Sequence, residues 1–256
     1  MRNHPLYSNS TYPLSHGRGS ESEPSPLSLR RGAVSGAFGV VGGVFLLLLL
    51  FFVASCSKDA DVYDPYHDWA ARNTEWYASV ADSARQAIRQ ARAAYGDEWE
   101  SHCAWRMYKS IQQSPAYDSH TIDDSICVHF VAKGEQGQVH PIQTDTIRVH
   151  FRGMLMPTTL ADGTTDELVF MQSYYGVFDA LTAAPQKAAV SSTLFTAGTR
   201  TALQQMVVGD DWWVYVPASL HYGSTTTGMV PAGSAVRYRL GLAAIYPVGE
   251  VVPEWK

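Results

Sequence analysis

The residue types that most often do chemistry are present, but their spacing argues against the common reactions. Cys103 and Cys127 lack the His/Asn pattern that accompanies a cysteine nucleophile. A Gly-x-Ser-x-Gly motif and paired catalytic carboxylates are both missing from the sequence. Four histidines lack metal-ligand spacing and are predicted to lie on the surface or in loops: His129, His140, His150 and His221. The sequence therefore gives no support for a cysteine nucleophile, a hydrolase or a metal site.

Three short segments of the C-terminal half carry the strongest signal. Residues 149–155 read VHFRGML, residues 203–210 read LQQMVVGD, and residues 221–223 read HYG. The second segment is followed by the strand-like WWVYVP of residues 212–217, and the third by GMVP at residues 228–231. Each segment alone is a weak signal, so their order and separation must carry the argument.

In that order and at those separations, the segments resemble the FKBP-type peptidyl-prolyl isomerase family over residues 124–246. The resemblance implies an antiparallel sheet wrapped around one helix, with a pocket for proline. Rotation about an X–Pro bond has a barrier of about 18–20 kcal/mol because the amide is conjugated. The twisted transition state is less dipolar, so an apolar and water-free cradle binds it better than the ground state. No cofactor, metal or nucleophile is required.

The resemblance also implies the site residues. Tyr222 falls on the tyrosine whose hydroxyl donates to the substrate carbonyl, and Phe170 on the aromatic residue that lines the proline pocket. These two are the expected catalytic residues. Phe151, Val230 and Tyr238 fall on other positions of the pocket wall and floor.

Several positions depart from the family pattern. Met171 replaces an Asp, and Phe151 replaces the Tyr that normally hydrogen-bonds to it. Losing both partners can be nearly neutral, so a drier pocket is expected. Thr199 falls on the floor Trp and Thr196 on an Ile, which leaves space unless neighbouring tryptophans or the insertion at residues 157–169 fill it. Weak or altered activity is therefore expected.

The segment before this region is predicted to be helical. An apolar stripe from residue 65 to residue 95 indicates a first helix, with Asp64 as its cap and Gly96 as its end. A second helix is expected over residues 98–111, and both helices are expected to pack on the C-terminal domain rather than form a dimer contact. In an oxidising envelope Cys103 and Cys127 could pair, and the sequence leaves this open.

From residue 124 onward the apolar period changes to two, which indicates half-buried antiparallel strands. Between residues 198 and 208 the period is helical again. The predicted fold is α+β: an antiparallel sheet wrapped around one short helix, preceded by an N-terminal helical segment. Adjacent Trp212 and Trp213 cannot both face inward. Four arginines are expected on the solvated face: Arg148, Arg152, Arg237 and Arg239.

The first residues have the pattern of an export signal. Two basic residues, Arg30 and Arg31, precede an uncharged apolar run over residues 32–53, and small residues then precede Cys56. This ending resembles the lipobox of bacterial lipoproteins, in which the cysteine is acylated. The expected location is the cell envelope, by lipid anchoring to the outer membrane on its periplasmic or outer surface. A membrane-spanning signal anchor is the lesser alternative.

The predicted organisation follows from these patterns. The net charge is -5, which gives no indication of nucleic-acid binding. The expected partners are Pro-containing polypeptide segments and the membrane, and the oligomeric state is left open. The expected parts are a leader (1–55), an acidic tether (56–64), a helical segment (65–118), the FKBP-like domain (122–248) and a tail (249–256).

Two functions remain open on the sequence. The first is a peptidyl-prolyl isomerase that assists the folding of exported proteins, with activity weakened by the departures at the site. The second is a catalytically inactive FKBP-like lipoprotein that binds Pro-containing or apolar segments.

Overall fold

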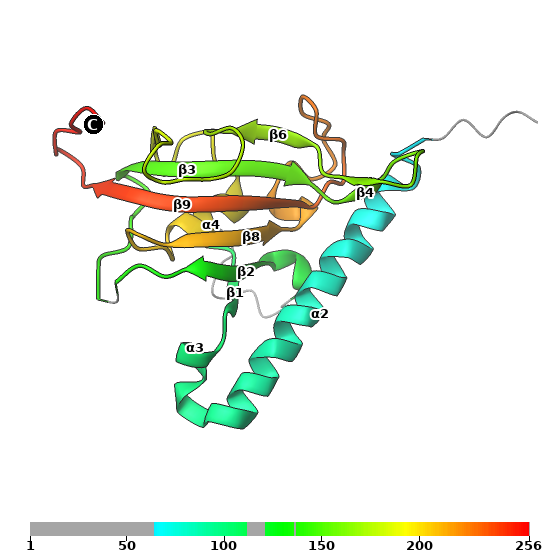
Figure 1. Cartoon of the computed structure of the whole chain (residues 1–256), viewed down its shortest axis with the longest axis horizontal. Coiled ribbons are helices and arrows are strands. Elements are labelled where there is room, and N and C mark those ends of the chain that lie inside the picture. The colour runs from blue at the N-terminus through cyan, green and yellow to red at the C-terminus, as the bar shows by residue number, and fades with distance from the viewer. Residues whose placement is uncertain (1–63, 112–120, 136, 256) are drawn as a thin grey trace, which may run out of the picture. The chain divides into compact units, whose positions relative to one another are not determined.

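An antiparallel sheet, seven-stranded over the residues described, carries the C-terminal part of the chain (Figure 1). The computed structural model describes residues 64–111, 121–135 and 137–255. The sheet strands are β1 (Trp105–Lys109), β2 (Ser125–Ala132), β3 (Thr146–Leu155), β6 (Val169–Gln172), β7 (Gln186–Ala189), β8 (Asp211–Val216) and β9 (Val236–Tyr246). A separate small hairpin pairs β4 (Thr158–Thr159) with β5 (Thr165–Asp166).

Strand β3 has the most partners in this sheet. The strand order is β1-β2-β8-β9-β3-β6, and β7 also pairs with β3. Gly153 lies opposite Tyr238 of β9 and opposite Met171 of β6. Side chains alternate between the two faces of a strand. Strand β3 can therefore bring residues of three strands together on one face.

Helix α4 (Ala197–Leu203) lies against one face of the sheet, called here the inner face (Figure 1). Val214 and Val216 of β8 are buried on this face. Gly198 is required for the close approach, because a Cβ atom there would overlap the Val216 side chain. A 3₁₀ turn, η3 (Ala218–Leu220), follows β8. The predicted fold class, a sheet with one short helix against it, is confirmed.

Helix α2 (Trp69–Tyr95) packs on the other, outer face of the sheet. Tyr77 is buried there beside Cys127, and its hydroxyl donates to the Ser125 carbonyl. The prediction that the first helix packs on the C-terminal domain is therefore confirmed. The helix begins at Trp69 rather than at residue 65. It ends as predicted at Gly96, whose φ is 53° and whose N–H donates to the Arg92 carbonyl.

The second predicted helix was wrong over most of its length. The chain forms a 3₁₀ turn η1 (Gly96–Glu98) and one helical turn α3 (Trp99–His102), and then enters β1. A second 3₁₀ turn, η2 (Ile122–Asp124), precedes β2. Strand β1 pairs with β2, whose partner residues lie 16 to 24 positions further along the sequence. Such long-range pairing overrides the local helical period.

Two predicted surface residues of β3 are buried. His150 is 3% exposed and Arg148 is 7% exposed. Phe178 packs edge-on against the His150 ring, and the Arg148 guanidinium donates to the Pro253 carbonyl and lies over Trp255. Segments from elsewhere in the chain cover this end of the strand, which its alternating pattern could not indicate.

The two described cysteines are both free and buried. Cys127 lies opposite Met107 in the sheet, four residues beyond Cys103. At about 3.3 Å per strand residue, this places the two cysteines well outside the 4.4–6.8 Å Cα separation of a disulfide.

The predicted lipid-modified Cys56, the leader and the tether up to residue 63 lie outside the described residues. Over the ranges that the structure does describe, it contains no helix long and apolar enough to cross a membrane.

Candidate functional site

Residues of three strands meet on the inner face at Gly153. A Cβ atom at this position would lie 2.7 Å from Tyr238 Cε1 and 2.8 Å from Phe170 Cζ. Glycine is therefore required for the two rings to pack over β3. The rings of Phe170 and Tyr238 meet edge to face, with centroids 5.6 Å apart and planes at 86°. The glycine of the first motif thus positions two of the predicted site residues.

The remaining predicted residues lie in the same core or at the start of α4. Phe151, Val230 and Tyr238 are buried in one core cluster, and Phe170, Met171 and Tyr222 pack against it. Thr196 and Thr199 are buried at the start of α4. The Thr199 hydroxyl donates to the Thr196 carbonyl at 3.1 Å. The two threonines therefore hold the first turn of α4.

His221, which was predicted to be a surface or loop residue, lies among the aromatic rings. Its ring centroid is 4.1 Å from that of Tyr222, 5.6 Å from Phe170 and 5.9 Å from Tyr238. We call Phe170, His221, Tyr222 and Tyr238 the aromatic cluster. Sequence analysis missed the role of His221, although it directly precedes the motif tyrosine.

Neutral hydrogen bonds join His221, Tyr238 and Met171, while the buried Nδ1 of His221 has no hydrogen-bond partner among the described residues. His221 Nε2 lies 3.0 Å from the Tyr238 hydroxyl, and this hydroxyl donates to Met171 Sδ at 3.4 Å. Burial lowers the pKa of His221 to about 4, so the imidazole is neutral near pH 7. Burial raises the pKa of Tyr238, and the nearby Tyr222 adds to this shift. The cluster therefore offers an uncharged surface.

Tyr222 is partly exposed, as are Phe170 and His221, and it lies on a turn fixed by backbone hydrogen bonds. The Gly223 N–H donates to the Ala218 carbonyl at 2.8 Å, and the Gly233 N–H donates to the Gly223 carbonyl at 2.8 Å. Gly223 has φ of 59°, a conformation that glycine adopts without strain. The turn thus presents one phenol at the edge of an apolar surface.

Helix α2 braces the segment that follows Val230. Trp69 Nε1 donates to Ser234 Oγ at 2.7 Å, and this hydroxyl donates to the Pro231 carbonyl at 2.6 Å. The Ala235 N–H donates to Asn73 Oδ1 at 3.0 Å. The N-terminal helix is therefore part of the structural support of the site.

A cavity of about 680 Å³ lies elsewhere, beside α3, β1 and β2. Its aromatic walls are Trp99, Tyr108, Phe130 and Trp212. None of the residues of the aromatic cluster lines it.

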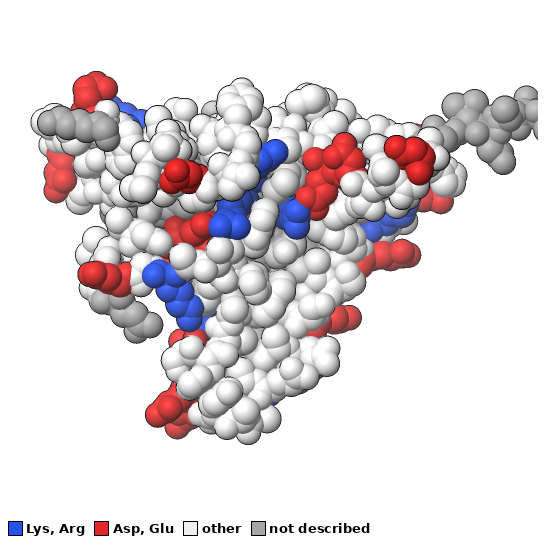
Figure 2. All heavy atoms as spheres, viewed as in Figure 1, with Lys and Arg blue, Asp and Glu red and all other residues white. Residues whose placement is uncertain are grey.

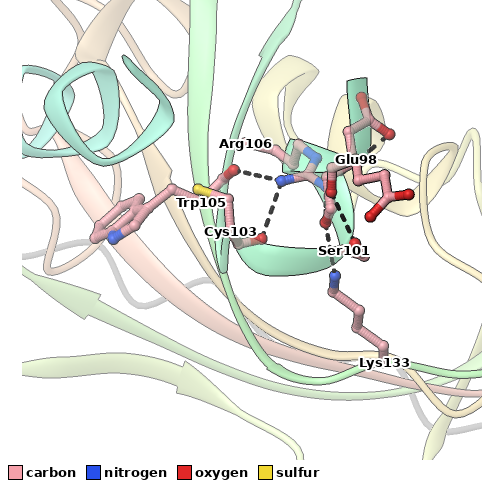
Figure 3. A network of polar contacts seen from close by, with 7 residues as sticks. Glu98, Ser101, Cys103, Trp105, Arg106 and Lys133 are labelled. Atoms are coloured by element: carbon pink, nitrogen blue, oxygen red, sulfur yellow. Dashed lines mark hydrogen bonds and ion pairs between the residues drawn. The ribbon is translucent and has the colours of Figure 1, made fainter. Parts of the chain in front are cut away.

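Figure 3 shows polar contacts beside that cavity, which Arg106 and Lys133 line. Arg106 Nη1 donates to the carbonyls of Cys103 and Trp105 at 3.0 and 2.8 Å, and its Nη2 donates to the Glu100 carbonyl at 2.5 Å (Figure 3). Lys133 Nζ donates to the same Glu100 carbonyl at 3.3 Å. Arg106 thus satisfies the carbonyl groups where α3 ends, and its role is structural.

Comparison with known protein families gives a match for the part of the chain that carries the aromatic cluster. Residues 137–243 match the family model of the FKBP-type peptidyl-prolyl cis-trans isomerase. The chain therefore contains a domain of the FKBP-type isomerase family, as the three motifs predicted. A search of curated proteins found no match.

Three of the solved structures that are similar to the chain illustrate the likeness. A peptidyl-prolyl cis-trans isomerase from Pseudomonas syringae pv. tomato has 18% identity and a TM-score of 0.37, covering 66% of this chain and 95% of its own. The three FKBP domains of wheat FKBP73 have 22% identity and a TM-score of 0.38, covering 50% and 48%. FkpA from Escherichia coli has 16% identity and a TM-score of 0.39, covering 80% and 81%.

Proposed function

We propose that this domain is a slow peptidyl-prolyl cis-trans isomerase that acts on exported proteins at the aromatic cluster. The observation that carries the proposal is that the partly exposed Tyr222 packs on His221, which also contacts the Phe170 and Tyr238 rings, within the region that matches the isomerase family. An uncharged surface favours the less dipolar, twisted amide over the planar one. The Tyr222 hydroxyl would donate to the substrate carbonyl.

The proposal is tested by exchange NMR on a Pro-containing peptide. The wild-type chain should exchange the two isomers faster than buffer alone. The Tyr222→Phe variant removes one neutral hydrogen bond, worth about 1 kcal/mol, so its rate above background should fall about fivefold. The matched control is Tyr175→Phe, because Tyr175 is 85% exposed and lies outside the aromatic cluster. Equal rates in both variants would remove Tyr222 from the reaction.

A second candidate is favoured by His221. Its ring contacts Phe170, Tyr222 and Tyr238, three residues that the resemblance assigns to the proline pocket, so it takes up space there. We therefore keep, as the alternative, a domain that binds Pro-containing or apolar segments without turnover. Peptide-induced shifts of the Tyr222 resonances without exchange above background would select this alternative.

The cellular setting is also part of the proposal. We propose that Cys56 is acylated and that the chain acts in the cell envelope, because the sequence before it has the pattern of a lipoprotein signal. Mass spectrometry of the chain purified from membranes tests this. An N-terminal peptide that starts at acylated Cys56 is the expected result, and an unmodified Cys56 inside an uncleaved chain would contradict it.

A further inference from the structure

The outer face of the sheet brings two arginines together across neighbouring strands. Arg152 of β3 lies directly opposite Arg239 of β9, and Arg239 lies opposite Trp213 of β8. Like charges directly opposite each other destabilise a sheet. Figure 2 shows this face, with basic atoms gathered over β3, β8 and β9 and acidic atoms beside them. The arrangement therefore needs compensation by negative charge.

Carboxylates of the protein neutralise some of these arginines but not others. The Asp211 carboxylate accepts two hydrogen bonds from Arg239, one of them from Nη2 at 2.6 Å. Arg237 pairs with the Glu167 carboxylate. Among the residues that the structure describes, Arg152 has no carboxylate within 4.0 Å. Its Nη1 donates to the Gly176 carbonyl at 3.0 Å, and its buried Nε has no hydrogen-bond partner.

A hollow opens beside these two guanidinium groups. It has a volume of about 260 Å³, and its wall includes Arg152, Tyr174, Phe178, Trp213 and Arg239. The Trp213 ring lies under the guanidinium of Arg239, with its centroid 5.1 Å from Cζ. Burial raises the pKa of Tyr174, while the charges of Arg239 and Arg152 act in the opposite direction. The hollow thus joins positive charge to aromatic walls.

We infer that this hollow is a binding site for an oxyanion, carboxylate or phosphate, carried on a small apolar or aromatic group. Arg152 supplies the charge-assisted hydrogen bonds, because guanidinium groups match the geometry of both anions. The apolar part of the ligand packs on Phe178 and Trp213. The site lies on the outer face, opposite the aromatic cluster, so it does not depend on isomerase activity.

Calorimetric titration of the full chain in neutral detergent tests the site. The probes are benzoate and phenyl phosphate, compared with acetate and inorganic phosphate, each at constant ionic strength. We expect saturable binding of at least one aromatic probe with a Kd of about 1 mM or tighter. The matching inorganic ion or acetate should bind at least severalfold more weakly. Equal binding of both kinds would overturn the role of the aromatic walls, and no saturation of any probe would overturn the site.

Matched variants assign the binding to Arg152. Arg152→Gln should weaken binding at least tenfold, as expected for loss of a charge-assisted hydrogen bond. Arg89→Gln, which alters an exposed arginine of α2, should leave the Kd within twofold. The thermal midpoint of Arg152→Gln should hold or rise, because a like-charge contact is removed. Unchanged binding would overturn the proposal, and so would a clearly lowered midpoint, since Arg152 would then serve the fold.

Discussion

The inner and outer faces of β3 and β9 differ in the charge of their side chains. Inward, Phe151 and Tyr238 lie in a core whose polar atoms are uncharged, including the imidazole of His221. Outward, Arg152 and Arg239 alternate with them and hold charge at a half-buried surface. The same two strands can therefore support an apolar reaction surface and a charged hollow, because alternate side chains point to opposite faces.

The comparison predicts that the inner face has no room for an added methyl group, whereas the outer face does. Gly153→Ala should lower the free energy of unfolding by about 3 kcal/mol, because the new Cβ collides with the Tyr238 and Phe170 rings. Gly241→Ala is the matched control on β9, since its nearest neighbour would lie 3.5 Å away on the outer face. It should change stability by less than about 1 kcal/mol. Urea unfolding measures both, and equal losses would contradict the comparison.

Because His221 is neutral in the folded chain, the free energy of unfolding should depend on pH. The folded pKa of about 4 lies below the unfolded value of about 6.5, so the folded chain binds fewer protons between these values. This contribution is complete above pH 6.5 and is lost as the pH falls toward 4. Between pH 7 and pH 5, it amounts to about 2 kcal/mol.

Urea unfolding of His221→Asn at the two pH values measures that contribution. The variant should lose less stability than the wild type on acidification, by about 2 kcal/mol. His67→Gln is the control, because His67 lies at the exposed start of the chain described. An acid sensitivity of His221→Asn equal to that of the wild type would show that His221 is not buried in its neutral form.

Helix α2 should support the inner face from outside the sheet. Asn73→Ala removes the acceptor of the buried Ala235 N–H and should lower stability by about 1–2 kcal/mol. The variant should also reduce peptide binding, because Ala235 lies at the end of the loop that carries Val230. Thr74→Ala, at an exposed position of the same helix, is the control and should cost less than about 0.5 kcal/mol. If Asn73→Ala changes neither stability nor peptide binding, helix α2 does not support the site.

The smallest effect is expected for an ion pair on the outer face. Glu167→Gln removes the half-buried partner of Arg237 and should cost less than about 1 kcal/mol, with the loss shrinking as salt is added. Thermal unfolding at low and high salt measures it. A loss as large as that of Gly153→Ala would mean that the outer face is as tightly determined as the inner one.

The sheet and α4 could be predicted because their signals are local. The period-two strands and the motif glycine Gly153 are recognisable in short segments of sequence. Gly153 lies where neighbouring side chains leave no space, and so does Gly198 of α4. The second helix could not be predicted correctly, because β1 forms by pairing with β2 and Arg106 satisfies the carbonyls of the preceding turn.

The site was only partly predictable for the same reason. Phe170, Tyr222 and Tyr238 could be aligned on motifs, and the structure brings them together. The position of His221 depends on how η3 ends and on rings from two distant strands. The burial of His150 depends on Phe178, and no local period signals either contact.

The isomerase rate of His221→Ala relative to the wild type tests the central claim most directly. Removing the imidazole should open the surface between Phe170, Tyr222 and Tyr238 to a proline ring. Exchange NMR on one Pro-containing peptide should then show turnover above background in the wild-type chain and a severalfold higher rate in the variant. If a folded variant and the wild-type chain both leave the uncatalysed rate unchanged, the domain does not isomerise X–Pro bonds at the aromatic cluster.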